Sequence, residues 1–92
     1  MKGFSIVCKS EKGEEVFLRD LNANKKVFEI VTVKTKPFLE TNFYLKKRGF
    51  TANSMKKMFS LVPDDELKAH LSRKMREYGA EEGVDYEVRL LE

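Results

Sequence analysis

Basic side chains at short spacing are the residues of this chain whose types could do chemistry. Residues 46–76 carry nine Lys or Arg against three Asp or Glu, whereas residues 77–92 carry six Asp or Glu against Arg89 alone. Because Lys and Arg neutralise phosphates and other anions, this split predicts a region that faces a polyanion. The candidate contacts are Lys46, Lys47, Arg48, Lys56, Lys57, Arg73, Lys74 and Arg76.

Arg73 and Arg76 lie one turn apart on an expected helix, beside the small residues Ala69 and Ser72. Such a face could approach phosphates or guanine edges closely. The expected arrangement of helix, three-residue link and helix also has the spacing of a helix-turn-helix, whose second helix enters the major groove. The alternative for these residues is an ordinary solvated helix face.

Lys46, Lys47 and Arg48 form a compact cluster beside Phe43 and Tyr44. Basic residues interleaved with aromatic ones can bind single-stranded nucleic acid by charge and stacking. The alternative is a helix C-terminus that is stabilised by cations.

Residues suited to catalysis or metal binding are few. His70 is the only histidine and Cys8 the only cysteine, so a cysteine-based zinc site and an internal disulfide are excluded. Cys8 is expected to be a small buried hydrophobe. We see no glycine-rich phosphate loop and no carboxylate pair placed for acid–base work. The sequence therefore predicts no enzyme, no metal and no cofactor.

Length and composition predict one domain, residues 1–92, with a net charge of +3 and a charged share of 36%. No apolar run approaches the ~20 residues of a membrane span, and no signal peptide is recognised. We expect a cytoplasmic protein with no membrane partner.

A β-meander is expected over residues 1–36. Residues 4–10 alternate with Phe4, Ile6 and Cys8 on one face. A polar turn and a second strand at residues 16–18 would complete a hairpin. The third strand is expected over residues 27–35.

A helical segment is expected over residues 37–79. Residues 38–48 stay open between helix and strand, with Pro37 and Gly49 favouring a helix. Thr51 is a candidate N-cap for a helix that Pro63 ends.

The next helix begins after Pro63 with three acidic residues at the positive end of its dipole. Its expected buried stripe is Leu67, Leu71, Met75 and Tyr78, and Gly79 is its expected C-cap. Residues 80–92 should form an acidic loop and a terminal strand over residues 84–91.

The expected fold class is α+β: a small antiparallel sheet, made of a three-strand N-terminal meander plus a C-terminal strand, packed with two or three helices. The expected core residues are Ile6, Val31, Val33, Met55, Phe59, Leu67, Leu71 and Met75.

The C-terminal half resembles the phage antirepressor domains of the AntA/AntB type. Residues 73–79 are similar to that family's basic helix ending in Tyr-Gly, and residues 81–86 to its acidic loop and Asp-Tyr strand entry. Residues 51–61 resemble its preceding helix, although the Asn-Ala pair is reversed and the chain has no Trp. The resemblance implies a phage or mobile-element protein that regulates transcription, with Arg73, Lys74 and Arg76 as contacts.

Two functions follow as hypotheses. The first is a small nucleic-acid-associated regulator that binds DNA or RNA through its basic helical face. The alternative is a small phage-type inhibitor or adaptor that binds a protein partner, such as a repressor or a host nuclease in the manner of an anti-CRISPR protein.

Overall fold

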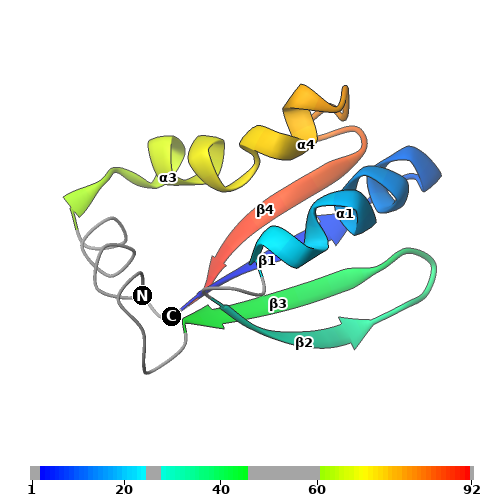
Figure 1. Ribbon diagram of the computed structural model, residues 1–92, viewed down its shortest axis with the longest axis horizontal. Helices are drawn as coiled ribbons and strands as arrows, with labels where there is room; N and C mark the ends of the chain where they lie inside the picture. Colours follow the sequence, from blue (N-terminus) through cyan, green and yellow to red (C-terminus); the bar gives the residue numbers. More distant parts are fainter. Residues whose placement is uncertain (1–2, 25–27, 46–60, 92) are drawn as a thin grey trace.

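The computed structural model describes residues 3–24, 28–45 and 61–91. Four strands and three helices lie in these ranges (Figure 1). In chain order they are β1 (Gly3–Cys8), α1 (Glu11–Asn24), β2 (Phe28–Lys34), β3 (Glu40–Leu45), α3 (Asp64–Leu71), α4 (Arg73–Glu77) and β4 (Tyr86–Leu91). A small antiparallel sheet packed with helices confirms the α+β class.

The sheet has the order β2-β3-β1-β4, and every neighbouring pair is antiparallel. With α1 between β1 and β2, and α3 and α4 before β4, this is the connectivity of the split βαβ, or ferredoxin-like, motif. β1 is central: Phe4 lies opposite Phe43 of β3 and Leu90 of β4. The first and last strands are therefore neighbours.

Helix α1 replaces the polar turn and the second strand that were expected over residues 11–18, so the N-terminal meander is wrong. The Gly13 N–H donates to Ser10 Oγ at 3.0 Å, which caps the helix N-terminus. Val16 and Phe17 are buried and Leu21 is partly buried, which is a helical rather than an alternating spacing.

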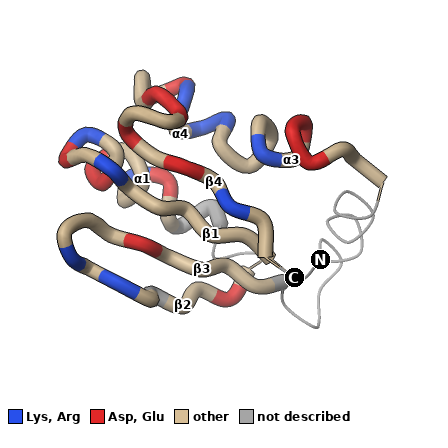
Figure 2. The backbone as a smooth tube through the Cα atoms, turned by 180° about the vertical axis from the view of Figure 1, so that it is seen from behind, with Lys and Arg blue, Asp and Glu red and all other residues tan. Residues whose placement is uncertain are grey.

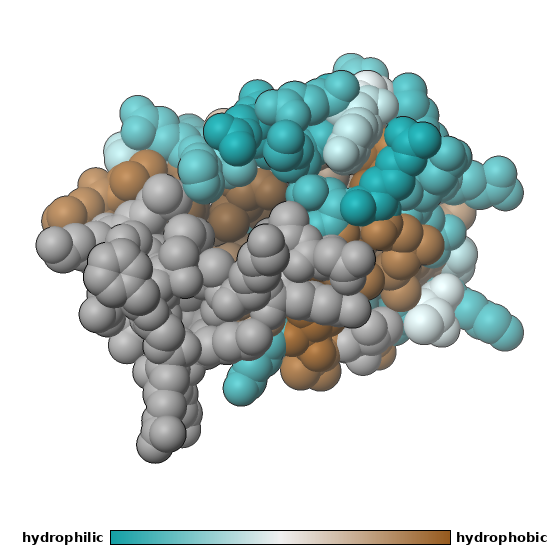
Figure 3. All heavy atoms as spheres, viewed as in Figure 1, coloured by the Kyte–Doolittle hydropathy of each residue, from teal (hydrophilic) through white to brown (hydrophobic). Residues whose placement is uncertain are grey.

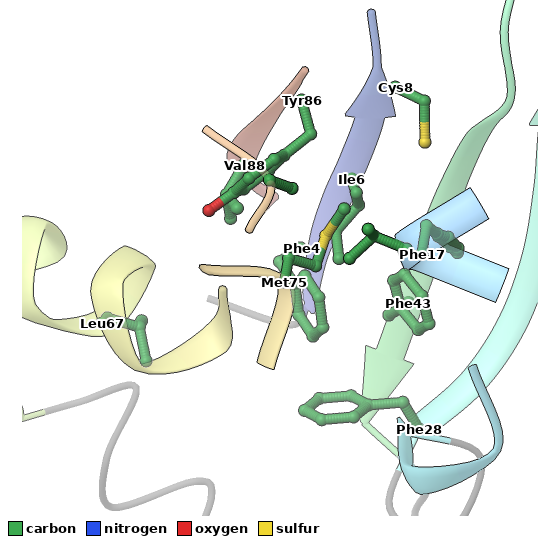
Figure 4. Close-up of a cluster of buried hydrophobic side chains, with 12 residues drawn as sticks. Phe4, Ile6, Cys8, Phe17, Phe28, Phe43, Leu67, Met75, Tyr86 and Val88 are labelled. Atoms are coloured by element: carbon green, nitrogen blue, oxygen red, sulfur yellow. The ribbon is translucent and has the colours of Figure 1, made fainter. Parts of the chain in front are cut away.

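The core lies between the sheet and the helices, on the face that carries Phe4, Ile6 and Cys8 as expected. Figure 4 shows this cluster, in which the rings of Phe4 and Phe43 stack with centroids 4.6 Å apart. Phe28 meets Phe4 edge to face at 5.0 Å. Aromatic contacts of this geometry add to the stabilisation from burial.

Strand β2 is confirmed, but its inward face is the opposite of the expected one. Phe28 is buried and Ile30 packs against the core, whereas Val31 and Val33 are 51% and 57% exposed. Since alternate side chains of a strand point to opposite faces, the burial of Phe28 and Ile30 places Val31 on the outward face. A register irregularity between Thr32 and Lys34 makes Val33 the extra residue.

Strand β3 lies within residues 38–48, the segment for which the sequence did not decide between helix and strand. Residues 40–45 pair with both β1 and β2, so the expected helical segment over residues 37–79 is wrong there. Thr41 and Phe43 are both buried, which is the burial of every second residue expected of a strand with one face toward the core. Lys46, Lys47, Arg48, Lys56, Lys57, Met55, Phe59 and the expected Thr51 cap lie outside the described residues.

The expected helix after Pro63 is broken into α3 and α4 at Ser72. Leu67 and Met75 are buried and Leu71 is partly buried, as expected. Ser72, expected on the exposed face, is 0% exposed, and Tyr78, expected in the core, is 45% exposed. The break changes the rotation of the second helix, which moves these residues between faces.

Candidate polyanion-binding face

Helix α4 carries three of the basic residues that the sequence predicted. Buried Met75 and Ser72 fix the helix against the core, so Arg73, Lys74 and Arg76 lie on its exposed side. The turn after it ends at Gly79, whose φ of 89° confirms the expected glycine C-cap. Figure 1 shows α4 above β4 and close to α1.

Glu77 pairs with two of these cations. Its carboxylate lies 3.0 Å from Lys74 Nζ and 3.8 Å from Arg73 Nε. The hydrogen bond with Lys74 lowers the pKa of Glu77 and raises the pKa of Lys74. Both pairs are exposed, and exposed pairs stabilise a fold only weakly. A phosphate could therefore take the place of Glu77.

Arg76 has a structural contact as well. Its guanidinium donates to the Ala69 carbonyl oxygen at 2.6 Å. That carbonyl belongs to the last turn of α3, where unpaired C=O groups favour a cation. Arg76 therefore links α3 to α4 and is less available than Arg73 or Lys74 for a ligand.

Helix α1 adds two cations to this side of the molecule. The Arg19 guanidinium lies over the ring of Tyr78, 5.6 Å from its centroid. A Cβ placed on Gly79 would lie 3.8 Å from Lys12 Nζ, so Lys12 passes beside the end of α4. We call the set Lys12, Arg19, Arg73, Lys74 and Arg76 the α1–α4 basic face.

One acid of α1 also lies at this face. Burial raises the pKa of Asp20, while the charges of Lys74 and Arg73 lower it and that of Glu77 raises it. Asp20 is therefore within electrostatic reach of α4. Asp20 and Glu77 thus lie among the cations of the basic face, and Lys12 is also within electrostatic reach of Asp85.

Lys12 and Arg19 were not among the contacts predicted from the sequence, because Lys12 was expected in a turn and Arg19 just after a strand. The signal was nevertheless there: the two residues are seven positions apart, which is two helical turns. Ser10 as a cap followed by Val16, Phe17 and Leu21 at helical spacing would have placed both cations on one face.

Charge is unevenly divided between the described and remaining parts of the chain. Of the 18 Lys and Arg, eight lie outside the described ranges; of the 15 Asp and Glu, only Glu92 does. The described part therefore holds ten basic against fourteen acidic residues. Figure 2 shows both signs interspersed along it. Among the described residues the α1–α4 basic face is thus a local feature, in a chain whose full sequence has a net charge of +3.

The sheet face opposite the core has its charges largely paired. Arg89 of β4 lies 3.3 Å from Glu87 and 4.0 Å from Glu40 of β3, and Lys9 lies 3.5 Å from Glu87. Arg89 thus reaches across β1, where Ser5 is only 2% exposed. Since two carboxylates accompany these two cations, the cluster has no excess of positive charge and is a poorer polyanion site than the α1–α4 basic face.

Comparisons of the chain with protein-family models, with curated proteins and with solved structures found no match. The resemblance to the AntA/AntB antirepressor domains therefore stays a prediction.

Two further observations concern the described residues alone. No group of three or more His, Cys, Asp or Glu among them is placed to hold a metal ion. None of the helices described has the length and apolar character needed to cross a bilayer.

Proposed function

We propose that this protein is a small nucleic-acid-associated regulator that binds through the α1–α4 basic face. The observation that carries the proposal is the contact of α1 with the end of α4, where Arg19 lies over the Tyr78 ring and Lys12 passes beside Gly79. It adds two cations next to the helix that carries Arg73 and Lys74. A regulatory role and a phage or mobile-element origin rest only on the antirepressor resemblance.

The proposed contacts are mainly with phosphates. Arg73 and Lys74 have exposed side chains that both pair with one similarly exposed carboxylate, that of Glu77. A nucleic-acid backbone would replace that single carboxylate with several phosphates and release bound counterions. Tyr78, already covered on one side by Arg19, supplies an exposed ring on which a base could stack.

Base readout by α4 alone is not part of the proposal. The helix has five residues, and its Arg76 is held at the end of α3. A short helix with one committed arginine suits backbone contact better than insertion into a major groove. We therefore expect binding that depends more on salt than on sequence.

The test is fluorescence anisotropy of a labelled duplex and a labelled single strand, titrated with the protein across a salt series. Arg73→Ala and Lys74→Ala should each weaken binding and reduce the log–log salt slope by ~0.9. Glu77→Gln should tighten binding because it frees both cations. Lys36→Ala, an exposed lysine beyond β2, is the matched control and should change nothing specific to this face.

Two outcomes would count against this proposal. The first is the absence of binding at low salt. The second is binding that Arg73→Ala, Lys74→Ala and Glu77→Gln leave unchanged, which would place the contacts elsewhere on the chain.

The second candidate is a protein-binding inhibitor or adaptor, for example of a nuclease or a repressor. Exposed apolar side chains favour it: Leu18, Val31, Val33, Leu61 and Val84 are each more than half exposed. Figure 3 shows hydrophobic residues reaching the surface below the hydrophilic helices α3 and α4. A stoichiometric protein complex that persists at salt high enough to abolish nucleic-acid binding would support this function over the first.

A further inference from the structure

Strand β2 forms one edge of the sheet. Among the described strands it pairs only with β3, so its other side has no strand partner there. In an antiparallel strand, alternate residues direct their N–H and C=O groups away from the neighbour. An edge of this kind is a template for pairing with a further strand.

The composition of β2 favours such pairing. Its seven residues are FEIVTVK, which are β-branched or aromatic at five positions. Val31 and Val33 expose more than half of their surface. Native edges are commonly protected by charge, by proline or by a bulge. Here the protection consists of the irregularity near Val33 and the charges of Glu29 and Lys34.

Those two charges have opposite signs and lie on the same face of the sheet. Glu29 is opposite Tyr44, and Lys34 is opposite Glu40, on the side away from the core. Both residues are exposed. If two β2 strands pair antiparallel with Val31 opposite Val31, and Val33 stays the extra residue as it does against β3, Glu29 of each copy lies opposite Lys34 of the other. A parallel pairing would instead place like charges together.

We propose that β2 pairs antiparallel with β2 of a second copy of this chain, which joins two four-stranded sheets into one. The two Val31 side chains meet at the twofold axis and lose water, and the Glu29–Lys34 contacts set the direction and register. This self-complementarity is the reason for choosing a second copy over an unrelated strand. A seven-residue strand is a small interface, below the ~1,000 Å² of a stable one, so the dimer is weak and concentration-dependent.

The test is sedimentation velocity of the full chain over a concentration series. The unaltered protein should show a rising sedimentation coefficient that reaches a dimer. Glu29→Lys should abolish the rise, because the introduced ammonium group would face Lys34 of the other copy. The double variant Glu29→Lys with Lys34→Glu should restore it, because the charges are then complementary again.

Two further variants distinguish pairing of the β2 strands from non-specific association through exposed apolar residues. Val31→Lys places a cation at the twofold axis and should abolish the dimer. Val84→Lys changes a similarly exposed valine in the loop before β4 and should leave the dimer intact. Since Lys34→Glu also places a carboxylate opposite Glu40, thermal melts followed by circular dichroism must show that each variant is folded at the temperature used.

A protein that stays monomeric up to about 1 mM would overturn the proposal. So would a dimer that Glu29→Lys and Val31→Lys leave unchanged, or one that the double charge reversal fails to restore while the variant is folded. The result is independent of nucleic-acid binding, because Arg73→Ala and Lys74→Ala should leave the dimer unaffected.

Discussion

Ser10 and Asp85 are 75 positions apart in the chain, and the Ser10 hydroxyl donates to Asp85 Oδ1 at 2.7 Å. The same hydroxyl accepts from the Gly13 N–H, and Asp85 Oδ2 accepts from the Glu81 N–H at 2.8 Å. The Lys9 N–H donates to the Asp85 carbonyl at 2.8 Å. The start of α1 and the entry to β4 are therefore held by one polar cluster.

This cluster predicts that the stability of the fold decreases at acidic pH. The Glu81 N–H, then the Ser10 hydroxyl and the Lys12 charge, lower the pKa of Asp85. A carboxyl whose folded pKa is depressed stabilises the fold fully above its unfolded pKa of about 3.9. That contribution is lost as the pH falls through the lower folded pKa.

The measurement is urea unfolding of the unaltered protein and Asp85→Asn over a pH series. The difference in free energy of unfolding should be largest near neutral pH and should shrink below about pH 4. Ser10→Ala should weaken the same dependence while also removing the helix cap. A difference that is constant across the series would show that the Asp85 charge does not contribute in this way.

Gly13 should not tolerate a side chain, although it lies within a helix. Alanine is favoured over glycine by about 1 kcal/mol in helix interiors. However, a Cβ at this position would collide with the Asp85 backbone carbonyl. Gly13→Ala should therefore destabilise the protein by about 1–3 kcal/mol, the usual cost of overpacking.

The matched control for Gly13→Ala is Glu15→Ala, which lies on the exposed side of the same helix and should change stability by less than about 0.5 kcal/mol. Denaturant midpoints of the two variants measure the difference. A Gly13→Ala protein more stable than its parent would contradict the close packing of α1 against Asp85.

The two faces of β2 should differ sharply in their contribution to stability. Phe28 is buried against Phe4, so Phe28→Ala should cost about 3–5 kcal/mol. Val31 is half exposed, and Val31→Ala should change stability by about 0.5 kcal/mol or less in the monomer. Thermal melts at low protein concentration measure both effects, and equal losses would mean that Val31 is buried too.

The thiol of Cys8 should be unreactive in the folded protein. Burial, together with the nearby charge of Glu14, raises its pKa to about 12. Since the thiolate is the reactive form, Ellman's reagent at about pH 8, below the ordinary thiol pKa of ~8.5, should label Cys8 only through unfolding. Labelling rates should therefore rise steeply with urea.

The control for this experiment is a Cys8→Ala protein that carries Glu15→Cys at an exposed site. It should react at once at the same pH. Rapid labelling of Cys8 without denaturant would show that the strand opens locally far more readily than the whole domain.

Several elements could be predicted from the sequence because their local residue pattern agrees with their tertiary packing. The alternation of Phe4, Ile6 and Cys8 predicted the first strand and its buried face, and Gly79 predicted a helix end. The terminal strand and the inward Leu67 and Met75 were predicted as well. These residues follow the period of the element to which they belong.

Other predictions were wrong where a short apolar run is compatible with two periodic patterns. The run from Val16 to Leu18 alone is too short to distinguish a strand from a helix. The cap at Ser10, the helical spacing continued by Leu21 and the close approach of Gly13 to Asp85 favour α1. In β2, two alternating sets of apolar residues compete. Phe28 and Ile30 face the core because Phe28 completes the ring cluster with Phe4 and Phe43.

The sequence by itself determined the α+β class, most of the strands and the basic character of α4, because these depend on composition and on periods within one segment. Only the tertiary structure decided that residues 40–45 form an inner strand, since their partners β1 and β2 are separate segments of the chain. It also decided that Lys12 and Arg19 lie with α4, because that meeting depends on how α1 and α4 pack on a shared core.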